Sequence, residues 1–392
     1  MLKIPLKYNV RNLFVRKVTT TLTVLGIGLV VAVFLCVMAL GEGITKVFTT
    51  SGSEKNVLVL RQNSQSELQS GLAREQVPLV LDLPGIEKDA DGLPLASAEL
   101  NIVLNLEKRE GGSSNVTLRG VQEKGMKLRP KMRLTAGRLF RPGLSEVIVS
   151  ESVSTRFTDC GIGDTLHFGS YRWTVVGHFD AGGTAPDSEI WTDVEGMMGT
   201  FKRNGYSSVL ARTADRAMRD RFVAGLAADA RLALEGKVEK TYYDEQTATA
   251  APIKFLGVFV GVVMAIGACF GAMNTMYAAV AARTREIATL RALGFSRLAI
   301  LVSFVLESVA LSLLGGLVGC VLGALAVKLA LSGVTGTTNF ATFSEVVFAF
   351  QLTPALLGTG IVFAVAMGFF GGLFPAGRAA FTKITAALRQ VG

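Results

Sequence analysis

Residues 283–294 of the chain read RTREIATLRALG, a short charged stretch between two long apolar runs. Residues 264–282 before it and residues 298–306 after it carry no charge. Ala, Leu, Arg and Glu are good helix formers, and no Pro interrupts the stretch. The pattern predicts a short charged helix between two membrane spans, with Gly294 just past its end in the left-handed conformation.

Two kinds of surface are expected on this short helix. Ile287, Leu290 and Leu293 recur at spacings of three and predict one apolar edge. The charged residues of the stretch are Arg283, Arg285, Glu286 and Arg291. Two interpretations stay open from these residues alone: a docking helix at the membrane surface, or a solvated basic loop that only fixes the topology.

Apolar residues are concentrated in four parts of the chain. Half of the 392 residues are hydrophobic and 43 are Gly, which is too apolar for an ordinary soluble domain. Four segments with almost no charge are long enough to cross ~30 Å of hydrocarbon as helices. We predict four transmembrane helices, over residues 18–40, 253–282, 298–327 and 346–377.

Positive charge lies beside these predicted spans. The net charge is +9, yet residues 41–252 hold 26 basic and 28 acidic residues, a distribution that excludes a nucleic-acid-binding protein. The surplus lies in three short flanks, which the positive-inside rule places in the cytoplasm. The topology then has residues 1–17, 283–297 and 378–392 inside, and residues 41–252 and the short loop 328–345 outside.

The N-terminal arm and the large outer segment differ in pattern. Residues 1–17 interleave apolar and basic side chains, which predicts an amphipathic helix on the cytoplasmic surface; a plain topogenic charge cluster is the alternative. Residues 41–252 predict an α+β extracytoplasmic domain inserted between the first and second spans. Its expected strands are 56–61, 100–106, 115–120, 146–150, 165–168, 171–178, 207–212 and 238–243, and its expected helices are 79–83 and 214–235.

The third predicted span carries a glycine repeat and one carboxylate. Gly315, Gly319 and Gly323 recur every four residues, a spacing that lets membrane helices approach closely. Related pairs in the second predicted span are Gly257 with Gly261 and Gly267 with Gly271. Glu307 lies within the third span, where a carboxylate is usually functional or paired. We expect either a coupling switch or a structural ion pair, with a basic partner within reach in the N-terminal arm.

No sequence motif predicts catalysis in this chain. The phosphate-binding pattern G-x-x-x-x-G-K-[ST] is absent from the sequence, and so is the G-x-S-x-G pattern of serine hydrolases. The two histidines, His167 and His178, are too few for a zinc site of ordinary spacing. We therefore predict no catalytic residue, no cofactor and no metal site, and we expect a non-catalytic protein.

Several stretches resemble the MacB/FtsX-type permeases, the membrane subunits of type VII ABC transporters. They are YNVRNL at 8–13, LGIG at 25–28, LGEG at 40–43, NTM at 274–276, RTREIATLRALG at 283–294, and GLFPAGRAA at 372–380. Glu307 also falls where the family has a Glu. Residues 41–252 resemble the MacB-type periplasmic core at LPGI (83–86), GRLF (137–140), EVIV (146–149) and VVG (175–177). The chain departs from the family pattern at Gly377 and in lacking a fused ATPase domain.

The resemblance implies a function by mechanotransmission in the bacterial inner membrane. It implies a separate ABC ATPase subunit that binds ATP and Mg²⁺ and pushes on residues 283–294, and a second permease copy or a paralogue. The cargo would be a drug, peptide, lipid or lipoprotein that is exported or extracted. The outer partner would be a periplasmic adaptor with an outer-membrane channel, or a lipoprotein carrier. The alternative is an FtsX-like signalling scaffold that controls a cell-wall hydrolase or a sensor.

Overall fold

The computed structural model describes residues 17–168, 171–229, 231–329, 335–339 and 343–381. The chain divides into two compact units. We call residues 1–42, 252–333 and 350–392 the helical unit, and residues 43–251 with 334–349 the sheet unit. The predicted amphipathic arm and the last part of the tail, residues 1–16 and 382–392, lie outside the described residues.

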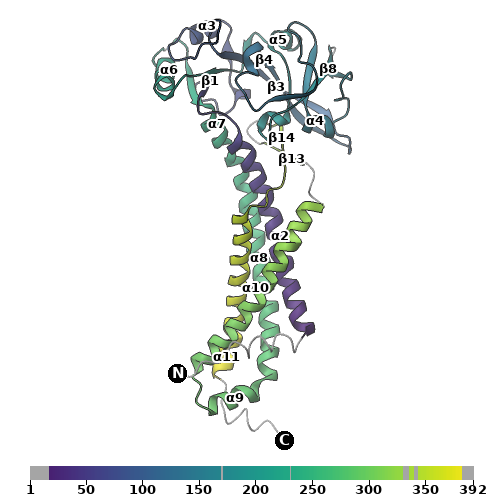
Figure 1. The fold of residues 1–392 in the computed structure, drawn as a ribbon, viewed down its shortest axis with the longest axis vertical. Coiled ribbons are helices and arrows are strands. Elements are labelled where there is room, and N and C mark those ends of the chain that lie inside the picture. Colours follow the sequence, from purple (N-terminus) through teal and green to yellow (C-terminus); the bar gives the residue numbers. More distant parts are fainter. Residues whose placement is uncertain (1–16, 169–170, 230, 330–334, 340–342, 382–392) are drawn as a thin grey trace. The chain divides into compact units, whose positions relative to one another are not determined.

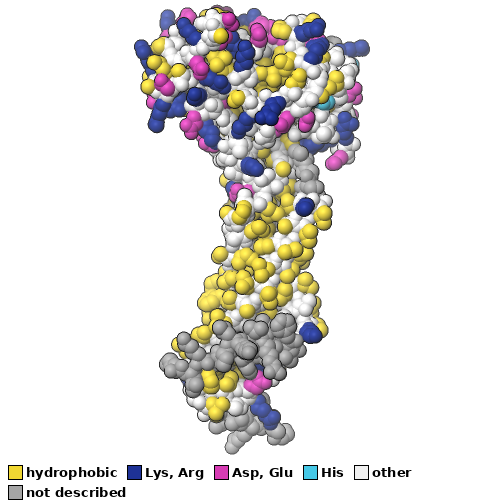
Figure 2. Space-filling view, viewed as in Figure 1, with side chains coloured by type: hydrophobic (Ala, Val, Ile, Leu, Met, Phe, Trp, Pro, Cys, Tyr) yellow, Lys and Arg dark blue, Asp and Glu magenta, His cyan; other side chains and the backbone are white. Residues whose placement is uncertain are grey.

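Four long helices and one short helix form the described part of the helical unit (Figure 1). By length and composition, each long helix is able to cross a membrane. Hydrophobic side chains cover their surface, whereas Lys, Arg, Asp and Glu are spread over the sheet unit (Figure 2). The helices are α2 (Lys17–Thr50, whose last residues belong to the sheet unit), α8 (Ala251–Ala282), α9 (Thr284–Ala292), α10 (Arg297–Leu329) and α11 (Pro354–Phe381).

Glycines allow α2 and α10 to pack closely inside the helical unit. A Cβ atom on Gly319 would lie 2.6 Å from the carbonyl oxygen of Gly28 and 2.7 Å from Cβ of Val31. A Cβ on Gly315 would lie 2.9 Å from Ile27, and one on Gly323 would be in ordinary contact with Leu35. The glycine repeat therefore faces another helix of the same chain.

The two glycine pairs of α8 have different surroundings. A Cβ on Gly257 would lie 2.8 Å from Val37, and one on Gly261 would lie 2.7 Å from Phe34, so this pair packs on α2. Gly267 and Gly271 have no described atom within 4 Å of such a Cβ. The same spacing thus marks a contact at one end of the helix and an open face further along.

One mixed sheet organises the sheet unit. Among the described residues it has ten strands, in the order β12-β1-β11-β3-β4-β9-β6-β8-β5, with β7 paired to β8. The β4–β9 and β6–β8 pairs are parallel and the others antiparallel. The strands are β1 (Asn56–Arg61), β3 (Ala96–Glu107), β4 (Ser113–Val121), β5 (Arg133–Gly137), β6 (Glu146–Ser150), β7 (Thr165–Phe168), β8 (Tyr171–Asp180), β9 (Glu189–Asp193), β11 (Ser208–Arg212) and β12 (Leu234–Val238).

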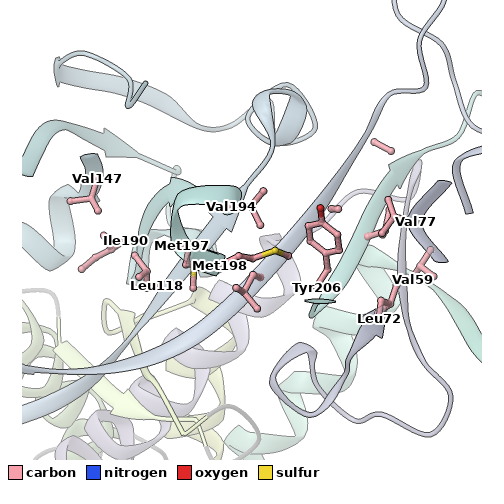
Figure 3. Close-up of a cluster of buried hydrophobic side chains, with 14 of the residues drawn as sticks. Val59, Leu72, Val77, Leu118, Val147, Ile190, Val194, Met197, Met198 and Tyr206 are labelled. Atoms are coloured by element: carbon pink, nitrogen blue, oxygen red, sulfur yellow. The ribbon is translucent and has the colours of Figure 1, made fainter. Parts of the chain in front are cut away.

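Short helices and two small strand pairs complete the sheet unit. Figure 3 shows Val194, Met197 and Met198 of α5 beside Leu118 and Ile190 of the sheet, within the main hydrophobic core. Asp193 caps α5 by accepting a hydrogen bond from the N–H of Gly196 at 3.0 Å. The remaining elements are α3 (Gln76–Leu81), α4 (Glu151–Arg156), α5 (Val194–Phe201), α6 (Arg216–Ala228), α7 (Glu239–Gln246), β2 (Leu72–Ala73) with β10 (Gly205–Tyr206), and β13 (Thr335–Thr338) with β14 (Glu345–Phe348).

The expected strand over residues 238–243 is wrong. Strand β12 ends at Val238, and helix α7 begins at Glu239. Tyr242 and Tyr243 favour a strand by propensity. However, the buried residues of α7 are Glu239, Tyr242, Tyr243 and Gln246, and this three-to-four-residue spacing is the period of a helix. The expected helix over 214–235 likewise ends early, at Ala228, because its last residues belong to β12.

The segment between α10 and α11 differs from the short loop expected at 328–345. Strands β13 and β14 form an antiparallel hairpin that belongs to the sheet unit. The N–H of Val347 donates to Oγ of Ser188 at 2.8 Å, and Nδ2 of Asn115 donates to the carbonyl of Phe343 at 2.9 Å. The fourth span was expected from residue 346, but its helix begins at Pro354, because the apolar residues 346–348 belong to the buried strand Glu345–Phe348.

Candidate functional site

An ion pair joins the start of α9 to the middle of α10. Nη1 of Arg283 donates to Oε2 of Glu307 at 2.9 Å, and both side chains are less than 10% exposed. An ionised group inside a membrane is strongly disfavoured unless it is paired. This contact therefore supplies Glu307 with a partner and fixes the first turn of α9. The structure places that partner at Arg283, whereas the N-terminal arm, our expected source, lies outside the described residues.

A small cavity with polar and apolar walls adjoins the ion pair. Arg283 and Glu307 line it together with threonines of α2 and polar residues of α8 and α10, and its volume is about 40 Å³. A cavity needs roughly 10–15 Å³ to hold one water molecule. The ion pair thus has room beside it for ordered water. The polar lining residues are Thr19, Thr20, Thr23, Thr275 and Ser308.

The residues of the expected apolar edge of α9 do not share one face: Ile287 packs into the helical unit and Leu293 is exposed. Ile287 is 2% exposed and belongs to a core cluster with residues of α8, α10 and α11. Leu290 is half-buried, whereas Leu293 is 66% exposed. A single apolar edge that includes Ile287 is therefore wrong as a docking surface, because Ile287 anchors α9 to its own chain.

The C-terminal end of α9 is a Schellman motif, as a glycine at this position predicts. The N–H of Phe295 donates to the carbonyl of Leu290 at 3.1 Å, and the N–H of Gly294 donates to that of Arg291 at 3.2 Å. Gly294 has a φ of +94°, which confirms the expected left-handed conformation. Ser296 then caps α10 by accepting from the N–H of Ala299. Both ends of α9 are thus held in a defined geometry.

The outward face of α9 combines charge with one large apolar side chain. Arg285, Glu286, Thr289 and Leu293 are exposed on it. Such a face suits contact with another protein, since apolar anchors contribute most of the affinity and rim charges set the register. It offers no nucleophile or metal ligand set, and the described part of the chain has no group of three or more His, Cys, Asp or Glu placed to bind a metal.

A buried charge network in the sheet unit was missed by the sequence analysis. Arg119 contacts three carboxylates: its Nη1 lies 2.9 Å from Glu67 and 2.7 Å from Glu99, and its Nε lies 2.8 Å from Glu189. Arg129 makes two further bonds to Glu99, at 2.7 and 2.8 Å. Burial opposes ionisation of Glu67, but the charge and hydrogen bonds of Arg119 hold the pKa of that carboxyl below its ordinary value.

A weak signal for this network was present in the sequence. Arg119 stands between Leu118 and Gly120 inside the expected strand 115–120, and Glu99 stands between Ala98 and Leu100, directly before the expected strand 100–106. A charged residue in such a strand is ordinarily assigned to a solvated face. Both faces of this part of the sheet are covered, so the charges are buried and paired instead.

Two family models match the chain. The MacB-like periplasmic core domain matches residues 20–228, and the FtsX-like permease C-terminal domain matches residues 258–384. The chain belongs to the MacB/FtsX-type ABC transporter permeases. This permease is a membrane protein with a periplasmic domain, and permease subunits of this kind are generally non-catalytic.

Curated relatives of this permease cover nearly all of it. It is 24% identical over 96% of its length to the "Uncharacterized ABC transporter permease YknZ" of Bacillus subtilis, of which it covers 96%. It is 27% identical, again over 96% of its length, to the "Macrolide export ATP-binding/permease protein MacB" of Pasteurella multocida. It spans 59% of that second relative, less than two thirds of its length.

Two solved structures show weaker similarity to the permease. The extracellular domain of YknZ from Gram-positive bacteria aligns with a TM-score of 0.37 and 18% identity, over 46% of this chain and 99% of that domain. The periplasmic region of MacB from Actinobacillus actinomycetemcomitans aligns with a TM-score of 0.37 and 13% identity, over 50% of this chain and 92% of that region. The family assignment therefore depends on the sequence matches alone.

Proposed function

We propose that this permease is the membrane subunit of an ABC complex, and that a separate ATPase subunit drives it by pressing on α9. The observation that carries the proposal is the construction of α9. Arg283 and Ile287 hold it to α10 and to the core of the helical unit, while Arg285, Glu286 and Leu293 remain exposed. A helix held in this way moves with the spans when a partner moves it.

The connectivity of the chain supports mechanotransmission. The chain passes between the helical and sheet units four times, at 42/43, 251/252, 333/334 and 349/350. Each of the four long helices is therefore joined covalently to the sheet unit at one end. Movement of any of the spans would act directly on the periplasmic sheet unit, without a substrate path through the membrane.

The positive flanks support an orientation in the bacterial inner membrane. Residues 3–17, 283–297 and 378–389 hold the excess Lys and Arg, which places α9 and both termini in the cytoplasm. The sheet unit is then periplasmic or extracellular. Cysteine at Thr289, exposed on α9, should react only from inside, and cysteine at Ser113, exposed in the sheet unit, should react from outside.

The proposed cargo is a drug, peptide, lipid or lipoprotein, exported or extracted from the outer side of the membrane. A second copy or a paralogue would complete a dimer, and an adaptor or a lipoprotein carrier would receive the cargo. The match of residues 20–228 to the MacB-like core favours this transport role over the FtsX-like scaffold that controls a hydrolase or sensor.

Photo-crosslinking tests the proposed docking surface. The permease is co-expressed with an ABC ATPase subunit from the same organism, and a photoreactive residue replaces Leu293, which is 66% exposed on α9. The control position is Leu22, which is 65% exposed on α2 within the apolar bundle. We expect an ATPase adduct from position 293 and none from position 22. Equal capture at both positions, or capture at neither, would refute docking on α9.

A further inference from the structure

The sheet unit contains a cavity that has no part in the proposed coupling. Its volume is about 220 Å³. Residues from the end of α2, from the loop before β5, from the segment before β9 and from the start of α7 line it. For comparison, an engineered apolar cavity of about 150 Å³ binds benzene. This cavity is therefore large enough for a ligand of several heavy atoms.

The walls of the cavity are mainly apolar. Leu128, Met132, Pro186 and Tyr243 line it, and each of these side chains is buried or nearly so. An apolar wall favours a ligand with an apolar side chain, because burial removes the apolar surface of that group from water.

Arg129 lines the cavity with one donor unused. Its side chain is 8% exposed, and its Nη1 and Nη2 are bonded to Glu99 at 2.7 and 2.8 Å. Its Nε is buried and has no hydrogen-bond acceptor among the residues that the structure describes. An unpaired buried donor is unfavourable, so a ligand acceptor placed there would be stabilised.

Glu239 lines the same cavity with one acceptor unused. It is 3% exposed, and Oε2 accepts from the N–H of Ser53 at 3.0 Å and from Nδ2 of Asn56 at 2.9 Å. Within the described part of the chain, Oε1 receives no hydrogen bond. The cavity thus offers a donor on Arg129 and an acceptor on Glu239.

Lys131 also lines the cavity, but it is exposed and its Nζ donates to the carbonyl of Thr50 at 2.6 Å, so Arg129 and Glu239 are the buried charges of the lining. These two opposite buried charges select against a charged ligand. An anion near Arg129 would be repelled by Glu239, and a cation near Glu239 would be repelled by Arg129. A neutral amide satisfies both groups, because its carbonyl accepts from Arg129 and its N–H donates to Glu239. We propose that this cavity is a binding site for a small neutral ligand that combines an amide with an apolar side chain.

Binding is tested on the full chain in nanodiscs, without any ATPase, so the result does not depend on the proposed function. The probes are N-acetyl-L-leucinamide, its anionic counterpart N-acetyl-L-leucine and its cationic counterpart L-leucinamide, followed by ligand-observed NMR. We expect the neutral diamide to bind at least about tenfold more tightly than either charged probe, which corresponds to about 1.4 kcal/mol.

Two proline variants separate the cavity from nonspecific association with lipid or protein. Pro130 lines the cavity and is exposed, so Pro130→Trp should obstruct it without entering the core. Pro142 is an exposed proline that is not part of the cavity lining, so Pro142→Trp is the matched control. We expect Pro130→Trp to weaken diamide binding at least about tenfold and Pro142→Trp to leave it unchanged.

Glu239→Gln tests the charge selection itself. It removes the negative charge that repels an anion in the cavity, so N-acetyl-L-leucine should gain affinity relative to the diamide. The proposal is overturned if the three probes bind equally, if the two tryptophan variants behave alike, or if Glu239→Gln leaves the order of affinities unchanged.

Discussion

The sheet unit and the helical unit bury charge in different ways. In the sheet unit, Arg119 contacts three carboxylates and Arg129 shares one of them, so every guanidinium in the network has several bonds. In the described part of the helical unit, the buried charges are one pair, Arg283 with Glu307, beside a small cavity. Several ion pairs must therefore break together before the side chains of the sheet unit's network rearrange. In the helical unit, Arg283 and Glu307 rearrange when one ion pair breaks.

The largest expected effect comes from breaking the network. Arg119→Met would leave Glu67, Glu99 and Glu189 without their shared cation in a buried site. Removing one partner of a buried ion pair destabilises a protein by about 3–5 kcal/mol. We expect the sheet unit to unfold at a much lower temperature, measured by differential scanning fluorimetry of the full chain in detergent.

An exposed arginine provides the control for this variant. Arg231 pairs with Asp229 on the surface, and its side chain is 76% exposed. Surface ion pairs contribute little to stability. Arg231→Met should therefore melt as the wild type does. Equal melting of Arg119→Met and the wild type would show that the network does not stabilise the sheet unit.

The next effect comes from breaking the single pair of the helical unit. Arg283→Leu leaves Glu307 buried without its partner and should destabilise the helical unit by roughly 2–3 kcal/mol, near the apparent cost of a charge inside a membrane. The double variant Arg283→Leu with Glu307→Leu removes both charges and should recover most of the loss. The measurement is a double-mutant cycle of unfolding in mild detergent. Additive losses would contradict a direct pair.

A smaller effect is expected at the glycine contact between α2 and α10. Gly319→Leu places a side chain against the backbone of Gly28, and overpacking of this kind typically destabilises by about 1–3 kcal/mol. Gly267→Leu is the control, because no described atom lies within 4 Å of its Cβ position. Protease resistance of the two variants in nanodiscs should differ, with Gly319→Leu cleaved faster. Equal resistance would place Gly319 away from a helix contact.

The smallest expected effect is a pH dependence of the stability of the sheet unit. Burial raises the pKa of Glu67 in the folded state, but Arg119 lowers it more, so the folded pKa lies below the ordinary value. The ionised Glu67 therefore stabilises the fold fully above a pH of ~4.3, the ordinary pKa of Glu, and this stabilisation is lost as the pH falls through the folded pKa. Glu67→Gln should be less stable than the wild type at pH 7, and the difference should narrow on acidification. Chemical unfolding of the full chain across this pH range measures it. A difference that stays constant with pH would contradict the ionised pair.

Burial shifts the pKa of Glu239 in the opposite direction from that of Glu67. Desolvation raises its pKa, so its protonation on acidification relieves a penalty instead of removing a contact. The acid response of the sheet unit is therefore a sum of opposing contributions. The pH dependence of the wild type alone therefore does not show the contribution of Glu67. The difference in stability between Glu67→Gln and the wild type isolates it.

Apolar length and strand alternation predicted much of the fold. The spans were recognisable because long uncharged segments have few alternatives, and the bounds of β1, β6 and β7 agree with the expected ranges. The strand at 238–243 was wrong because two tyrosines favoured it by propensity, whereas helix packing decided the outcome. The hairpin β13–β14 was missed because a short apolar run beside a span cannot be distinguished from the span by composition.

The candidate site was predicted in part. Gly294 and the short helix before it follow from local rules of helix formation and termination. The pairing of Arg283 with Glu307, 24 positions apart, depends on how α8, α9 and α10 pack, and no local pattern contains that information. The same reason explains why Ile287 points inward while Leu293 remains exposed.

Association with the ATPase tests the central claim most directly. Leu293→Asp changes an exposed side chain of α9, so the permease should fold normally, while Leu293→Met keeps the apolar contact as a matched control. We expect Leu293→Asp to weaken the Kd for the ATPase at least about tenfold, which corresponds to about 1.4 kcal/mol, and Leu293→Met to retain the ATPase. Full retention of the ATPase and of transport by Leu293→Asp would contradict coupling through α9.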